Sequence, residues 1–253
     1  MAEKVRHLSD LHYLFRIPIQ VVSNSSSPSR LQLDLRQYFN FKNNNQIKHY
    51  EACINILQDT DAALINAFKF QLCDMSSQSR SYEDMYLRLY GILDTAFMQY
   101  GAYKRLRYLL KHPEMKDTEN QFDRLDLIQL RHKAGAHSMD YNDKGNHRET
   151  RDSYRLVQHY LTARGERICL VDSNENWEEY NLMDCLVEFE KYTRDVLINL
   201  LEHLRINVIR SVKDRLWLEN YLKEMCEELI DYSTLDQNTR FWHNLIKNFK
   251  KEI

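Results

Sequence analysis

Apolar residues recur every three or four positions along much of this chain, which is the spacing typical of amphipathic helices. The first such stretch covers residues 46–75, and the second runs from 81 to 112, where His112-Pro113 should end a helix. Ser81 with Asp84 resembles a capping box at the start of the second stretch. The apolar positions are Ile47, Tyr50, Ile54, Leu57, Leu64, Phe68 and Leu72 in the first and Met85, Leu89, Ile92, Ala96 and Tyr100 in the second. The pattern predicts two consecutive long helices.

The same spacing predicts more helices in the rest of the chain. A third helix should begin near Asp117-Thr118 and continue to His137, because residues 140–146 have the composition of a loop. Residues 184–232 are strongly helical in pattern, and a final helix should occupy 233–253.

Two segments depart from the helical spacing. Residues 11–22 hold apolar residues that favour strands, arranged around Pro18 and followed by a polar Ser-rich break, so residues 1–43 are interpreted as an arm with a short strand or strap. Residues 167–171 are short, apolar and β-branched, and residues 174–176 are typical of a turn. We therefore expect a small β-hairpin near 153–182, paired with part of 154–162.

Composition supports a helical fold. Average usage would place roughly 18 glycines and 13 prolines in a chain of this length, whereas the chain has 5 and 3. The prediction is an all-α protein with long antiparallel helices: an arm at 1–43, a helical bundle at 44–232 that includes the β element, and a C-terminal helix at 233–253.

Charge and cysteine content indicate the cellular compartment and the kinds of partner, but say little about the activity. The formal net charge is −2, so any site for nucleic acid must be a local basic patch. Five cysteines without a C-x-x-C pair argue against a disulfide framework and against a thiolate zinc site. The first twenty residues lack the apolar core of a signal peptide, and no run of about 18 apolar residues occurs. We expect a cytoplasmic protein with no membrane partner.

The most informative segment is the end of the third predicted helix, Leu130-Arg131-His132-Lys133-Ala134-Gly135-Ala136-His137. An Arg followed by a His at similar spacing also occurs at Arg6 and at Arg107, so the spacing alone is weak. Only the Arg131 match is also followed by a Lys, an Ala before the His, and a loop.

This arrangement resembles the signature of the HEPN superfamily, in which Arg and His are separated by four to six residues and a polar residue follows the Arg. The resemblance is strong over these eight residues and loose over residues 46–202. It implies a helical bundle that dimerises through the helices bearing the motif. In many members it also implies a metal-independent ribonuclease of a toxin or anti-phage system, which needs no cofactor and is often controlled by an antitoxin or regulatory partner.

The residue types suit that chemistry. RNA cleavage without a metal needs a proton acceptor, a proton donor and positive charge on the phosphate. We assign Arg131 to phosphate binding, His137 to proton transfer, and His132 to substrate positioning or a second proton role. Glu83, Asp84 or Asp94 on the second predicted helix should hold the Arg131 guanidinium.

Helix geometry adds a constraint on Arg131 and His137. On a straight α-helix, residues six apart differ by about 240° in rotation and about 9 Å in rise, so the two side chains do not share a face. Either the helix end bends at Gly135, or a composite site forms across the two-fold axis of a homodimer. Both alternatives favour a homodimer that acts on RNA.

Further basic residues are candidates for RNA contact. Lys133 and the cluster of Lys104, Arg105 and Arg107 are predicted to bind the nucleic-acid backbone. The alternative for the cluster is a basic helix end that complements the helix macrodipole.

Three alternatives to a ribonuclease remain open. A metal site could be assembled from His132, His137, Asp140, Asp143 and His147, although no H-E-x-x-H spacing is present. The chain could be a catalytically inactive HEPN-like module that binds nucleotide, RNA or a protein partner. It could also be a helical scaffold unrelated to that family.

Overall fold

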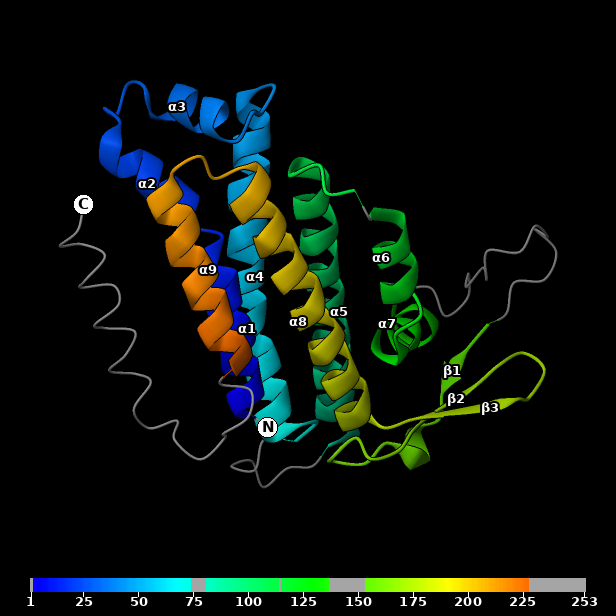
Figure 1. Cartoon of the computed structure of the whole chain (residues 1–253). Helices are drawn as coiled ribbons and strands as arrows, with labels where there is room; N and C mark the ends of the chain where they lie inside the picture. The colour runs from blue at the N-terminus through cyan, green and yellow to red at the C-terminus, as the bar shows by residue number, and fades with distance from the viewer. Residues whose placement is uncertain (1, 74–80, 114, 137–152, 228–253) are drawn as a thin grey trace.

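The computed structural model describes residues 2–73, 81–113, 115–136 and 153–227. Within these residues the protein is mostly helical, with a small antiparallel sheet on one side of the helices (Figure 1). The helical elements are α1 (Ala2–Leu14), α2 (Ile17–Ser25), α3 (Leu31–Tyr38), α4 (Asn44–Phe70), α5 (Tyr82–Leu109), α6 (Met115–Phe122), α7 (Asp126–Leu130), η1 (Arg131–Ala136), η2 (Gln158–Tyr160), α8 (Leu182–Asn207) and α9 (Val212–Glu227). The prediction of a mainly helical chain is confirmed.

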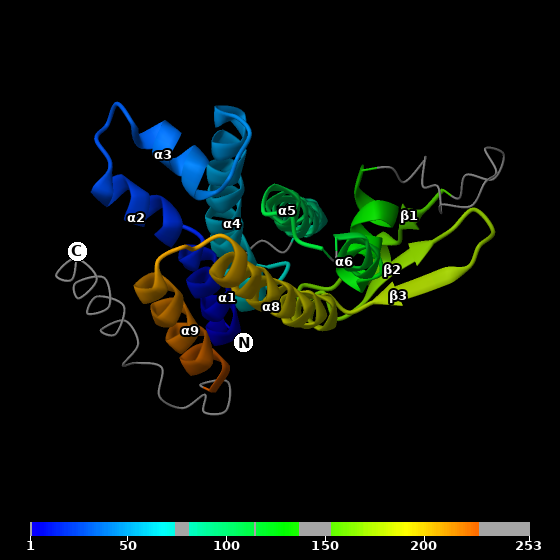
Figure 2. The ribbon, with the colours of Figure 1, turned by 45° about the horizontal axis from the view of Figure 1, so that its top comes forward.

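Among the described helices, α4 and α5 share the most extensive contact, and both were predicted from periodicity. Asn43 caps α4 by accepting a hydrogen bond from the backbone of Gln46, and Ser81 caps α5 by accepting one from the backbone of Asp84 at 3.1 Å. These caps satisfy backbone N–H groups that have no partner within a helix. The helices α1, α4, α5 and α8 lie side by side around the core, and the sheet projects on the side of α6 and α7 (Figure 2).

The expectation of a strand or strap in residues 1–43 is wrong, because this segment forms α1, α2 and α3. Leu8, Leu11 and Leu14 lie on one face of α1 and are buried, and α1 packs against α4 and α8. Pro18 lies in the first turn of α2, where a missing N–H costs nothing. The proline therefore marks a helix start, which was misinterpreted as a break.

Two helices predicted as continuous are interrupted. The third predicted helix divides into α6 and α7, because Leu125 is extended and the side chain of Gln129 bonds to the backbone oxygen of Asp123. The helical stretch at 184–232 divides into α8 and α9, and Ser211 accepts a hydrogen bond from the backbone of Asp214 at 3.3 Å at the new start. The predicted helix at 233–253 lies outside the described residues.

The predicted hairpin is confirmed, and so is its expected pairing with part of 154–162, which supplies the third strand. The strands β1 (Arg155–Leu156), β2 (Ile168–Val171) and β3 (Trp177–Tyr180) pair antiparallel in that order. All four residues of β2 are buried. In the turn that joins β2 to β3, the Asp172 carboxylate accepts hydrogen bonds from the backbones of Asn174 and Asn176, both at 2.8 Å.

A buried polar network joins α1, α4 and α5. The ring nitrogens of His12 lie 2.6 Å from Asp61 Oδ2 and 2.7 Å from the Tyr103 hydroxyl. Gln99 donates to Asp61 Oδ1 at 3.0 Å, and the Tyr103 hydroxyl donates to Gln99 Oε1 at 3.2 Å. All four residues are buried, so each polar atom depends on these partners.

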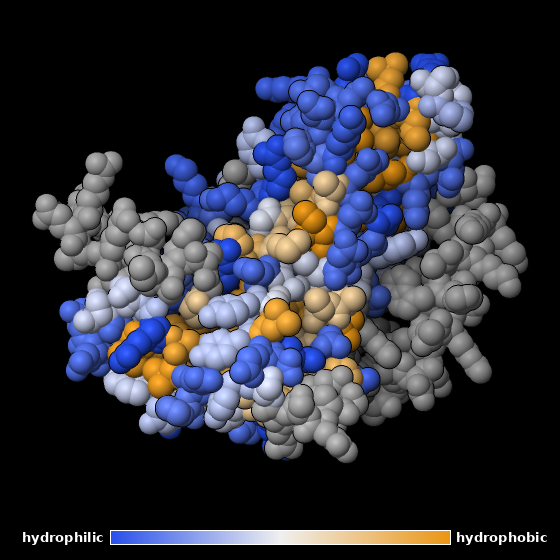
Figure 3. All heavy atoms as spheres, turned by 180° about the vertical axis from the view of Figure 1, so that it is seen from behind, coloured by the Kyte–Doolittle hydropathy of each residue, from blue (hydrophilic) through white to orange (hydrophobic). Residues whose placement is uncertain are grey.

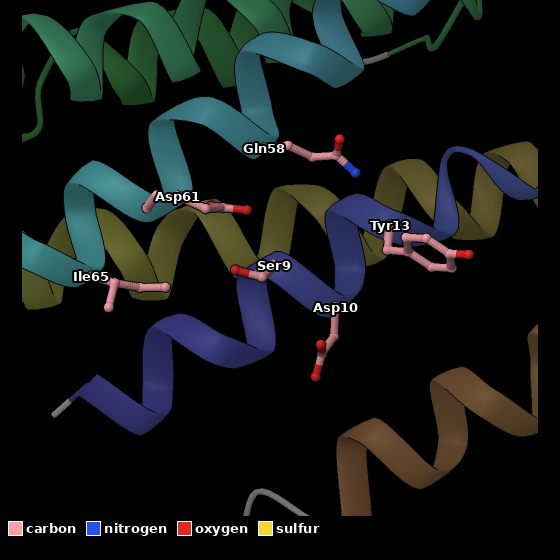
Figure 4. Close-up of a pocket in the computed structure, with 7 residues that line it drawn as sticks. Ser9, Asp10, Tyr13, Gln58, Asp61 and Ile65 are labelled. Carbon is pink, nitrogen blue, oxygen red and sulfur yellow. The ribbon is translucent and has the colours of Figure 1, made fainter. Parts of the chain in front are cut away.

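A cavity of about 390 Å³ lies between α1 and α4 beside this network. Ser9 from α1 and Asp61 from α4 extend into the space between the two helices (Figure 4). None of the residues predicted to form the functional site lines this cavity.

Cys53, Cys73, Cys169 and Cys185 are free thiols. Burial raises the pKa of Cys53 on α4 to about 11 and the pKa of Cys185 on α8 to about 12. Cys169 on β2 is also buried, and its pKa is raised. Among the described helices, none combines the length and the apolar character that crossing a bilayer requires.

The buried network gives a stability prediction. Replacing Tyr103 with Phe leaves His12 and Gln99 short of one buried partner, so we expect the free energy of unfolding to fall by about 1–3 kcal/mol. Urea denaturation followed by circular dichroism measures this change. Tyr108→Phe on the same helix is the matched control, since this exposed residue should alter stability by less than about 0.5 kcal/mol. Equal effects of the two substitutions would show that the network does not hold the helices.

Candidate functional site

The Arg131 motif begins where helical geometry changes. Leu127, Ile128 and Leu130 of α7 are fully buried against the core, and η1 continues the chain as a π-helix from Arg131 to Ala136. A π-helix closes its hydrogen bonds between residues five apart and occurs often at functional sites. The rotation assumed for a straight α-helix therefore does not apply to this segment.

Two side chains from α5 hold the guanidinium of Arg131. Its Nε lies 3.3 Å from Asp94 Oδ1, and its Cζ lies 3.9 Å from the centre of the Phe97 ring. The side chain is only 15% exposed. Of the three acids proposed from the sequence, the structure thus brings Asp94 to Arg131. Within the described part of the chain, the terminal nitrogens of Arg131 form no hydrogen bond.

His132 belongs to the same cluster. Its ring meets the Phe97 ring edge-to-face, with 5.4 Å between the centres. One aromatic side chain of α5 therefore contacts two of the predicted site residues. Phe97 was not identified from the sequence, because a Phe at helical spacing normally indicates a core position.

Lys133 faces the sheet. Its ammonium donates to the two carboxylate oxygens of Glu178 at 2.8 and 2.6 Å and to the Tyr180 hydroxyl at 3.3 Å, and it lies 5.1 Å from the centre of the Tyr154 ring. Burial raises the pKa of Glu178, but the hydrogen bonds from Lys133 and Tyr180 outweigh burial and hold the pKa below its usual value. Lys133 thus ties η1 to β3, and an RNA contact by Lys133 stays a prediction.

His137, the predicted proton-transfer residue, lies outside the described residues. The same holds for Asp140, Asp143 and His147 of the metal alternative. Among the side chains that the structure describes, no three His, Cys, Asp or Glu gather as metal ligands would.

The second basic cluster does not form one surface. Lys104 pairs with Glu119 at 2.9 Å, and Arg105 is exposed with its guanidinium 5.3 Å from the Tyr108 ring centre. Arg107 points into the core, where it is 3% exposed and donates to His112 Nδ1 at 2.7 Å. Of these three predicted RNA contacts, Lys104 and Arg105 reach the surface.

Arg107 and His112, an Arg and a His at a spacing close to that of the motif, do meet, but in a closed site. The His112 ring packs 4.8 Å from the ring of His203 on α8. Burial, assisted by the positive charge of Arg107 and by His203, lowers the pKa of His112 to about 4. The pair is structural, because a polymer of nucleotides cannot reach it.

His112 predicts a dependence of stability on pH. Since its pKa is about 4 in the folded chain and 6.5 ordinarily, the unfolded chain binds the proton more readily. The free energy of unfolding should therefore decline as the pH falls from 6.5 towards 4. His112→Asn keeps an acceptor for Arg107 and does not titrate, so urea denaturation across this range should show a shallower decline. His159→Asn, at an exposed position, should retain the wild-type slope, and an unchanged slope in His112→Asn would refute the assignment.

The motif residues thus divide into two groups: Arg131 and His132 against Phe97, and Lys133 against Glu178. Comparisons with models of known protein families, with curated proteins and with solved structures give no match.

Proposed function

We propose that this chain is a metal-independent endoribonuclease of HEPN type that acts as a homodimer in a toxin or anti-phage system. The observation that carries the proposal is the position of Arg131, which Asp94 and Phe97 hold in place next to His132. This is the arrangement expected of a guanidinium that binds phosphate within the motif.

The reaction would be an internal displacement. The ribose 2′-hydroxyl loses its proton to a base, the 2′-oxygen bonds to the adjacent phosphorus, and the bond from phosphorus to the 5′-oxygen breaks as that oxygen takes a proton. The products are a 2′,3′-cyclic phosphate and a 5′-hydroxyl. His137 would move the protons, Arg131 would offset the negative charge that grows on the phosphate, and His132 would position the substrate.

Asp94 supports this role by its geometry. The carboxylate engages Arg131 through Nε, which leaves the two terminal nitrogens for a bidentate contact with phosphate oxygens. The Phe97 ring restricts the guanidinium from one side. Asp94 and Phe97 are therefore positioning residues.

A second candidate is a HEPN-like module that binds nucleotide, RNA or a protein partner without catalysis. It is favoured by the ion pair of Lys133 with Glu178 and by the burial of Arg107, because both remove predicted cationic contacts from the surface. Such a module would bind RNA and leave it intact. An antitoxin or regulatory partner is compatible with either function.

The ribonuclease should cleave single-stranded RNA in EDTA, leave 2′,3′-cyclic phosphate ends, and spare DNA, which has no 2′-hydroxyl. His137→Ala should reduce the cleavage rate by about 10²–10⁴-fold, the usual contribution of acid–base catalysis. Arg131→Lys should also be impaired, since an ammonium cannot reproduce a bidentate contact. Gel analysis of labelled RNA measures both. Equal rates for wild type and His137→Ala would assign the activity to a contaminant, and inhibition by EDTA would favour the metal alternative.

Asp94→Asn tests the positioning role separately. Loss of the charge should loosen Arg131 and lower kcat by about tenfold, with KM and the melting temperature little changed. Glu83→Gln is the matched control, because Glu83 is an exposed acid on the same helix without a contact to Arg131. A merely structural Asp94 would lower the melting temperature and leave kcat of the folded fraction unchanged.

A further inference from the structure

One face of α5 is exposed along most of the helix, although glycines and large side chains with apolar surface occupy many of its positions. Its residues recur at heptad spacing, the pattern of helices that pair with another helix. The central positions are Gly91, Asp94, Met98, Gly101, Arg105 and Tyr108. Residues 91–108 span about 26 Å of helix. α5 lies behind α8 in Figure 1, and Figure 3 shows apolar patches among hydrophilic ones on that side of the molecule.

Packing among the residues that the structure describes does not explain this face. A Cβ added at Gly91 or at Gly101 would meet nothing within 4 Å, so neither glycine is required by a neighbouring element. Glycine is among the least favourable residues in a helix interior. Met98 is 51% and Tyr108 is 55% exposed. Large side chains thus alternate with glycines on a surface that the described residues leave uncovered.

We infer that a second copy of this chain docks on this face, with the two α5 helices antiparallel about a two-fold axis that passes between residues 99 and 100. In this register Met98 faces the partner's Gly101, and Tyr108 faces the partner's Gly91. Each large side chain then enters the space that a glycine leaves open, and each contact occurs twice, as a two-fold interface requires.

The charges fit the same register. Asp94 faces the partner's Arg105, and the symmetry repeats this pair. Parallel helices in register would instead place Asp94 against Asp94 and Arg105 against Arg105. Repulsion between these like charges disfavours the parallel pairing. The face therefore complements itself in the antiparallel orientation, which identifies the occupant as another copy of this chain.

The pairing of the two α5 helices adds a partner to the proposed ribonuclease site. The role of the pairing in RNA binding rests on that proposed function. Asp94 Oδ1 holds Nε of Arg131, so the partner's Arg105 reaches the carboxylate that positions the phosphate-binding residue. Each site then receives a second cation from the other chain. An RNA strand bound at Arg131 would extend across the interface onto the partner's Arg105, which lies at the same end of the paired helices as Asp94.

Sedimentation of the full chain tests the pairing without any RNA, so it can fail or succeed independently of the ribonuclease activity. At micromolar concentration the wild type should have twice the mass of the chain. Asp94→Arg alone and Arg105→Asp alone should each weaken the dimer by about tenfold or more, because like charges then face each other twice. Mixing these two variants restores opposite charges at both pairs, so the mixture should form a heterodimer with close to wild-type affinity.

Leu216→Ser on α9 is the matched control, since it removes an exposed apolar side chain elsewhere and should leave the mass unchanged. Gly101→Ala should give a more helical chain that dimerises less well, because it fills the space for the partner's Met98. A monomeric wild type, single charge variants that remain dimers, or a mixture that stays monomeric would each overturn the proposal.

Discussion

The hydrogen-bond network of His12, Asp61, Gln99 and Tyr103 is the constraint on which the helical arrangement depends. A carboxylate withdrawn from water is costly unless charged or polar partners surround it, and here the partners come from two other helices. A shift of α1 or α5 along α4 would break several of these bonds at once. The network therefore fixes the register of three helices, including the one that carries Asp94 and Phe97.

Much of the fold could be predicted, because long helices leave a periodic record in the sequence. α4 and α5 follow from apolar spacing and from Ser81, and the hairpin follows from the β-branched residues of β2. The failures have a common cause, since local sequence does not show what a residue packs against. A proline such as Pro18 is found both at the start of a helix and at a break between elements, so its position alone does not distinguish the two. The break at Leu125 depends on a side-chain hydrogen bond from Gln129 to the backbone oxygen of Asp123.

The candidate site was predictable in part. Arg131 and three acids that could hold it were evident from the sequence, but the crossing of α5 and α7 decides that Asp94 is the partner. Glu178 lies 45 residues from Lys133, and no local pattern connects them. Arg107 was interpreted as a surface cation, because arginine is usually exposed. Its burial depends on the bond to His112 and on Tyr100, Tyr103 and Phe122, which line a small pocket together with Arg107.

The buried cysteines can react with a thiol reagent only when the structure around them opens. A thiol reacts as its thiolate and only when a reagent can reach it. Cys53, Cys169 and Cys185 lie in the paired helices, the sheet and α8, where burial both hides the sulfur and disfavours its ionisation. Each thiol is therefore modified at the rate at which its own element opens. The order in which the three are labelled gives the order in which α4, β2 and α8 open.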